Sequence, residues 1–160
     1  MDQTHIHLLI THLPIFGSIL GGIVLAHAIW TKSIDTMIAA YYLFLISAAG
    51  AGIAYLTAEA AEESVENLQG VLDSNIEAHE EFALFALISL IILGLASVVG
   101  LFLTFKKSPL TRTTAIIILF LSLLSFGLVA RTGYLGGQIR HTEITNATTV
   151  QLNLDNDVDD

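Results

Sequence analysis

Four long segments without any charged side chain constrain this chain more than any other feature. No Asp, Glu, Lys or Arg occurs in residues 3–31, 36–58, 82–105 or 113–130. A helix needs about 20 residues, within a range of about 17 to 25, to cross the hydrocarbon layer of a bilayer, and each segment meets this requirement. The helices of a water-soluble bundle would carry charges on their outer faces at nearly every turn. The sequence therefore predicts an integral membrane protein with four membrane-spanning helices.

The predicted architecture is all-α, an antiparallel four-helix bundle embedded in the membrane. The connections after the first and third segments are short, so consecutive helices are expected to run in opposite directions. Pro14 falls inside the first helix, where neighbouring helices can satisfy the carbonyl that proline leaves unpaired. Residues 1–143 are expected to form one domain, followed by an acidic, loosely ordered tail at 144–160. The predicted helices cover residues 6–30, 34–66, 79–105 and 111–137.

Basic residues are distributed unevenly between the two ends of the predicted bundle. Lys32, Lys106, Lys107 and Arg112 all lie in or next to the two short connections, and loops rich in Lys and Arg stay in the cytoplasm. Both chain termini are therefore expected on the non-cytoplasmic side, together with every acidic residue except Asp35. This negative outer side would attract cations or a basic partner, or it would simply keep that surface hydrated.

The histidines follow the same asymmetry. Counting along the first helix at about 1.5 Å per residue places His12 just inside the outer boundary of the hydrocarbon layer. His27 lies alone near the cytoplasmic end, and it is expected to be a hydrogen-bonded bundle residue or an interfacial one. The remaining histidines are all expected beyond the outer boundary: His5, His7, His79 and His141.

Imidazole and carboxylate groups gathered on one side can bind either a haem or a metal ion. Two imidazoles on different helices suit the axial positions of a haem, whereas mixed imidazole and carboxylate ligands suit Zn, Fe or Mn. The chain has no cysteine, which excludes thiolate metal sites and covalent c-type haem. The candidate haem-binding residues are His7, His12, His79, Arg131 and Arg140. The candidate metal ligands are His7, His12, Glu62, Glu63, His79 and His141.

These polar residues also have purely structural interpretations. Histidines at a membrane boundary can be interfacial polar residues, which is the preferred interpretation for His5 and His141. Arg131 lies near the hydrocarbon boundary, where a cation is costly unless it is paired. We expect its partner to be an acidic residue on the second or third helix, although a propionate or an anionic lipid head group would serve equally.

Small residues recur four positions apart in every predicted helix. Such pairs usually allow helices to approach closely, and they could instead make room for a flat cofactor. Packing is the preferred interpretation because it is the ordinary use of this pattern. The pairs are Gly17 and Gly21, Gly50 and Ala54, Ala96 and Gly100, and Gly133 and Gly137.

The stretches at residues 7–14 (HLLITHLP), 56–66 (LTAEAAEESVE), 76–81 (IEAHEE) and 133–141 (GYLGGQIRH) carry a resemblance to a known family. The chain resembles, over residues 1–143, a bacterial membrane-protein family catalogued as a domain of unknown function. This resemblance implies four helices with the motif residues gathered on one side, in the bacterial cytoplasmic (inner) membrane. Some relatives are joined to cytochrome c modules, which implies a role in redox chemistry. The usual Thr-Gly of the second helix is Thr57-Ala58 here. The matching positions are His7, His12, Pro14, Glu62, Glu63, His79, Gly136, Gly137, Arg140 and His141.

Three functions are compatible with these features. The preferred one is electron transfer through a single b-type haem near the outer face, with His79 and either His7 or His12 as axial ligands. The first alternative is a non-haem metal site of histidine and carboxylate ligands, which could activate water for catalysis. The second is a structural or accessory membrane subunit without a cofactor. The expected partners are the lipid bilayer, other membrane subunits or a basic redox partner on the outer side, and no nucleic acid.

Overall fold

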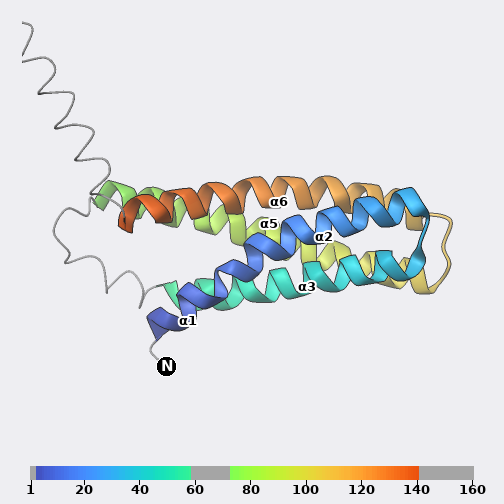
Figure 1. Cartoon of the computed structure of the whole chain (residues 1–160), viewed down its shortest axis with the longest axis horizontal. Helices are drawn as coiled ribbons and strands as arrows, with labels where there is room; N and C mark the ends of the chain where they lie inside the picture. Colours follow the sequence, from blue (N-terminus) through green and yellow to red (C-terminus); the bar gives the residue numbers. More distant parts are fainter. Residues whose placement is uncertain (1–2, 59–72, 141–160) are drawn as a thin grey trace, which may run out of the picture.

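The computed structural model describes residues 3–58 and 73–140, and these residues form a bundle of α-helices without β-strands (Figure 1). Four helical segments are long and apolar enough to span a membrane, so the chain is a multi-pass membrane protein. The predicted all-α, four-helix fold is therefore confirmed. The helices are α1 (Gln3–Ile10), α2 (His12–Thr31), α3 (Ile34–Leu56), α5 (Asp73–Phe105) and α6 (Thr111–Arg140).

The first membrane-spanning segment is broken at Thr11, whereas the sequence predicts one helix over residues 6–30. Pro14 explains the break, because proline lacks a backbone N–H and its ring clashes with the carbonyl four residues earlier, at Ile10. Thr11 keeps a right-handed helical conformation (φ −60°, ψ −20°), and its N–H donates to the His7 carbonyl over 3.0 Å. The break is therefore a kink between α1 and α2 that leaves the chain running onward in the same span.

At the end of the bundle opposite the two short connections, the limits of the other helices differ from the predicted ones. Helix α3 ends at Leu56, although the sequence predicts that it continues to residue 66. Thr57 leaves the helical conformation (φ −106°, ψ 2°), and residues 59–66 of the predicted continuation lie outside the described residues. Helix α5 begins at Asp73, before the predicted start at residue 79. Helix α6 extends to Arg140.

Two tight turns, between α2 and α3 and between α5 and α6, lie at one end of the bundle, which we call the turn end (Figure 1). Each turn begins with a lysine in the left-handed conformation, Lys32 (φ 57°) and Lys107 (φ 51°). After α5, the Ser108 N–H donates to the Leu103 carbonyl and the Lys107 N–H to the Thr104 carbonyl, both over 3.0 Å. These bonds satisfy the last carbonyls of the helix, and lysine at this position also interacts favourably with the helix dipole.

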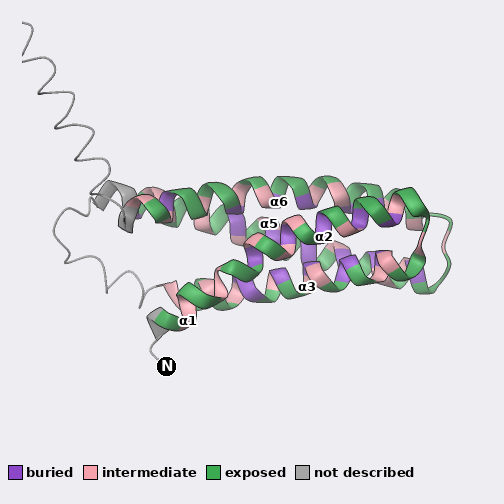
Figure 2. Ribbon diagram, in the orientation of Figure 1, coloured by how far each residue is buried: buried purple, intermediate pink, exposed green. Residues whose placement is uncertain are grey.

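The outer surface of the bundle is apolar and the interior is packed around a few large side chains. Figure 2 shows buried residues on the helix faces that meet and exposed residues on the faces that point outward. Leu25, Tyr41, Phe44 and Leu93 are fully buried. Leu95 and Phe120 are among many large apolar side chains that are more than half exposed. A continuous exposed apolar surface of this kind suits contact with lipid rather than with water.

Glycines bring α2 and α3 into close contact, as the packing interpretation predicts for Gly17 and Gly21, whereas an added Cβ atom on Gly137 would have nothing within 4 Å. A Cβ atom on Gly17 would lie 2.7 Å from the Ser47 Cβ atom, and one on Gly21 would lie 2.5 Å from a Phe44 ring carbon. The Ser47 hydroxyl donates across this contact to the Pro14 carbonyl over 3.1 Å. The glycines at these positions therefore serve helix packing, and the pair of helices is also joined by a hydrogen bond.

Candidate functional site

Two histidines at the end opposite the turns direct their rings toward other helices, and we call this the histidine end. There α1 packs against α3, and the start of α5 packs against the end of α6 (Figure 1). His7 lies on α1 and His79 lies on the first turns of α5. Both side chains are partly buried. The two helix pairs therefore each contribute one imidazole to the same end of the bundle.

The His7 ring is attached to the end of α3. Its Nδ1 atom lies 2.9 Å from the Ala54 carbonyl oxygen and 3.2 Å from the Thr57 hydroxyl oxygen. Because a carbonyl oxygen only accepts hydrogen bonds, Nδ1 carries a proton, and in the neutral ring this leaves the lone pair on Nε2. Thr57 is held in turn, since its hydroxyl lies 3.0 Å from the Ile53 carbonyl. The end of α3 therefore fixes both the tautomer and the direction of the His7 ring.

The His79 ring is attached to α6 in the same manner. Its Nδ1 atom lies 3.0 Å from the Thr132 carbonyl oxygen, so here too Nδ1 donates and Nε2 is left with its lone pair. The ring rests against Gly136, where an added Cβ atom would lie 3.0 Å from His79 Cε1 and 3.2 Å from Nδ1. A side chain at position 136 would push the ring away. Gly136 is therefore what allows His79 to reach the α6 backbone.

His7 and His79 are held by the same kind of hydrogen bond at the histidine end. Each donates from Nδ1 to a backbone carbonyl of a neighbouring helix, which leaves Nε2 outside that bond. Histidines that bind metals or haem almost always donate the other ring N–H to a carbonyl or carboxylate, because this bond orients the ring and raises its basicity. His7 on α1 and His79 on α5 thus both have the Nδ1 hydrogen bond that is typical of histidine ligands.

His12 does not join this pair. Its Nδ1 atom lies 3.0 Å from the Leu8 carbonyl of the same span, and its exposed ring stacks on Phe16 at a centroid distance of 6.3 Å. Phe16 is itself 54% exposed, so this face of α2 points outward from the bundle. Of the two predicted partners for His79, the structure therefore brings only His7 inward.

The other described histidines are exposed. His5 lies on the outer surface of α1, as the interfacial interpretation expects. His27 is exposed at the turn end, with its ring edge-on to Trp30 at 6.4 Å. Trp30 is 83% exposed, and aromatic residues are enriched at membrane interfaces. His27 is accordingly an interfacial residue by position.

Among the described residues, Arg131 contacts two aromatic rings; the acidic residues predicted at the end of the second helix, from residue 59 on, lie outside them. Its guanidinium carbon lies 5.6 Å from the centre of the Phe82 ring and 5.4 Å from that of Tyr134. A guanidinium over a ring face is stabilised by the ring quadrupole. The side chain remains exposed on α6. Arg131 therefore lies at the histidine end with its charge accessible from outside.

The remaining predicted ligands cannot be placed with this pair. Glu62, Glu63 and His141 lie outside the described residues, as does the side chain of Arg140. Within residues 3–58 and 73–140, no group of three or more His, Asp or Glu side chains is arranged to hold a metal ion. The described part of the site therefore contains two imidazoles and no third protein ligand.

Sequence reasoning missed three contributors to this site. Thr57 was noted only for its place in the family motif, although its hydroxyl contacts His7. Gly136 was matched to that motif without its role beside His79 being apparent. The Thr132 carbonyl could not be found from side-chain identities, since every residue carries one. The sequence signal for this contact is the spacing of Thr132 and Gly136, which lie one helical turn apart.

Comparisons with known proteins do not identify this site. No protein-family model, curated protein or solved structure matches this chain. The resemblance to the bacterial membrane family therefore stays a prediction, and so does the redox role that it implies. The described residues give their own reason to consider a cofactor, namely the matched hydrogen bonding of His7 and His79.

Proposed function

We propose that this protein binds a single b-type haem at the histidine end, with His7 and His79 as axial ligands, and carries electrons at the membrane surface. The observation that carries this proposal is the shared hydrogen bonding of the two rings. Both donate Nδ1–H to a backbone carbonyl from a neighbouring helix, over 2.9 and 3.0 Å. In the neutral rings this arrangement places the lone pair on Nε2, which is the atom that a haem iron would take.

The donor set favours haem over a non-haem metal ion. A haem brings four nitrogen ligands of its own and needs two from the protein, whereas non-haem sites commonly take three or more protein ligands. The described carboxylates next to His79 in the sequence, Glu77, Glu80 and Glu81, are all exposed. The two imidazoles that the described residues place at this end match the smaller requirement of a haem.

The chain's own residues have distinct tasks in this proposal. Ala54 and Thr132 hold the two rings through their carbonyls, which orients each imidazole and raises its basicity as a ligand. Gly136 leaves the space that His79 occupies. Arg131, exposed on α6, supplies a positive charge for a propionate. The bound haem would supply one-electron chemistry, with a potential set by its axial ligands and its surroundings.

The experiment is an absorbance spectrum of the full chain, expressed with added haem precursor and purified in detergent. We expect a Soret band at about one haem per chain, and reduction should give the sharp visible bands of a six-coordinate, low-spin iron. The variant His79→Ala should lose most of this absorbance, while His27→Ala, which changes an exposed histidine at the turn end, should keep it.

Two results would overturn the proposal. Purified protein without a Soret band, before and after incubation with haem, would exclude a haem-binding role. A full equivalent of Zn, Fe or Mn by elemental analysis, again without haem absorbance, would assign the histidine end to the non-haem alternative and bring Glu62, Glu63 and His141 back as candidate ligands.

A further inference from the structure

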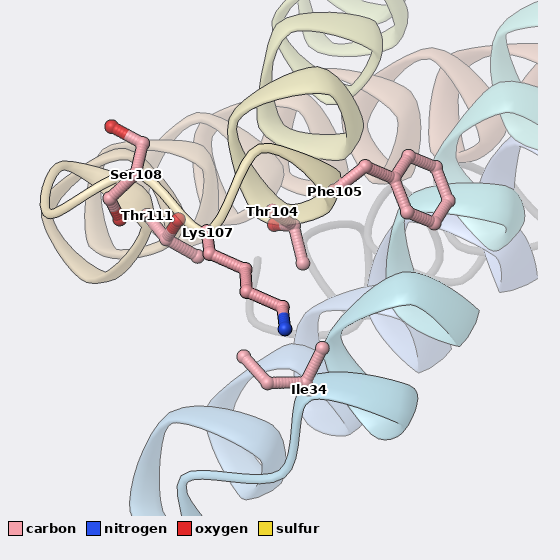
Figure 3. A pocket seen from close by; sticks show the side chains of 6 residues that line it. All are labelled: Ile34, Thr104, Phe105, Lys107, Ser108 and Thr111. Carbon is pink, nitrogen blue, oxygen red and sulfur yellow. Dashed lines mark hydrogen bonds between the residues drawn. The ribbon is translucent and has the colours of Figure 1, made fainter.

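A cleft at the turn end lies far from the two histidines and takes no part in the proposed haem site. It has a volume of about 420 Å³. Its walls come from the first residue of α3, the last turn of α5, the α5–α6 turn and the first residue of α6 (Figure 3). The lining residues are Ile34, Thr104, Phe105, Lys107, Ser108 and Thr111.

The walls of the cleft differ in character. Ile34 and Phe105 are apolar and remain 49% and 62% exposed, so they are open to whatever surrounds the bundle. Figure 3 shows the Lys107 side chain extending across the cleft toward Ile34, with its amine between the two walls. The cleft therefore combines an accessible apolar surface with one well-placed cation.

The charge around the cleft is strongly positive. Lys32, Lys106, Lys107 and Arg112 all belong to the turn end, against one acid, Asp35, in the first turn of α3. Four cations against one carboxylate favour an anionic ligand. The cleft also lies at the ends of apolar spans that finish at Phe105 and begin at Ile34, which is where lipid head groups meet a membrane protein.

We propose that this cleft binds the head group of an anionic phospholipid, with the phosphate at Lys107 and the start of an acyl chain along Ile34 and Phe105. Basic pockets between membrane helices recognise anionic head groups in this manner. A lipid accounts for both halves of the cleft, since its phosphate meets the amine while its hydrocarbon meets the apolar wall. A soluble phosphate would leave the apolar wall without a ligand.

Lys106 provides a matched control for Lys107. The two lysines are adjacent, and the Lys106 amine lies 5.8 Å from the centre of the Phe102 ring on the outer surface of α5, outside the cleft lining. The variants Lys107→Gln and Lys106→Gln remove the same charge from the same turn. A general electrostatic attraction would respond equally to both, whereas a ligand in the cleft would respond to Lys107.

The experiment is native mass spectrometry of the full chain in detergent, titrated with phosphatidylglycerol or with phosphatidylcholine of the same acyl chains. We expect the wild-type protein to prefer phosphatidylglycerol. Lys107→Gln should weaken phosphatidylglycerol binding about fivefold, as expected for one lysine contact with an anionic lipid, whereas Lys106→Gln should change it less than twofold. Lys107→Arg should retain the preference. Inorganic phosphate at equal concentration should not compete.

The variant Ile34→Glu tests the same cleft if Lys107→Gln fails to fold. A carboxylate at the first residue of α3 suits the helix dipole, so folding is expected to be retained while the phosphate is repelled. Equal binding of the two lipids, equal loss in the Lys106 and Lys107 variants, unchanged binding by Ile34→Glu, or effective competition by free phosphate would each overturn the proposal.

Discussion

The imidazole of His79 on α5 lies directly against Gly136 on α6. The closest approach of an added Cβ atom at Gly136 would be 3.0 Å, to His79 Cε1. This contact is what brings Nδ1 of His79 within 3.0 Å of the Thr132 carbonyl, one helical turn before the glycine. The position of the His79 ring therefore depends on the lack of a side chain at position 136 of the neighbouring helix.

Gly136→Ala should disturb His79 without unfolding the bundle. The added methyl group must displace the ring by a few tenths of an ångström, and crowding of this kind commonly costs about 1–3 kcal/mol. We expect weaker haem binding in a spectrophotometric titration. Gly137→Ala is the control, because nothing lies within 4 Å of its added Cβ atom. Equal haem affinity in both variants would show that the His79 contact is unimportant.

Gly21→Ala should loosen the contact between α2 and α3. Its Cβ atom would lie 2.5 Å from a Phe44 ring carbon, and Phe44 is fully buried, so it has little room to move. The expected fall in the free energy of unfolding is about 1–3 kcal/mol, measured by thermal denaturation in detergent. Gly52→Ala on α3, with nothing within 4 Å of its Cβ atom, should be unchanged or slightly more stable. A stable Gly21→Ala protein would contradict this packing.

Tyr41→Phe should stabilise the protein. The Tyr41 hydroxyl is the one buried side-chain polar atom without a hydrogen-bond partner in the described part of the chain, and the residue is 0% exposed. Removing a buried, unpaired hydroxyl should raise the free energy of unfolding by about 1 kcal/mol, visible as a higher melting temperature. A lower melting temperature would mean that the hydroxyl is bonded in the membrane-embedded protein.

Much of the fold is predictable from the sequence because hydrocarbon imposes a simple rule. Charged side chains are excluded from the layer, so the limits of the charge-free segments give the spans. The kink at Thr11 was not predicted, since Pro14 is compatible with either a kink or a bent continuous helix. The end of α3 at Leu56 was missed because Glu59 and Glu62 continue a helical spacing.

The candidate site was less predictable than the fold. Residue type alone makes His7, His12 and His79 equivalent. A rise count along straight helices places His7 with His79 beyond the outer boundary, but it does not show which ring faces a neighbouring helix. The structure separates them through contacts that depend on helix rotation, with His7 on the Ala54 carbonyl and His12 on its own span. Backbone carbonyl acceptors of this kind cannot be identified from the amino-acid sequence, because every residue has one.

The most direct test of the proposed site compares His7→Ala with His12→Ala in a haem titration of the purified protein. The two changes remove the same group five positions apart on the first membrane span, one facing α3 and one facing outward. We predict that His7→Ala loses the low-spin, six-coordinate spectrum and that His12→Ala retains it. A normal spectrum in His7→Ala, or its loss in His12→Ala alone, would contradict the assignment of His7 and His79 as the ligand pair.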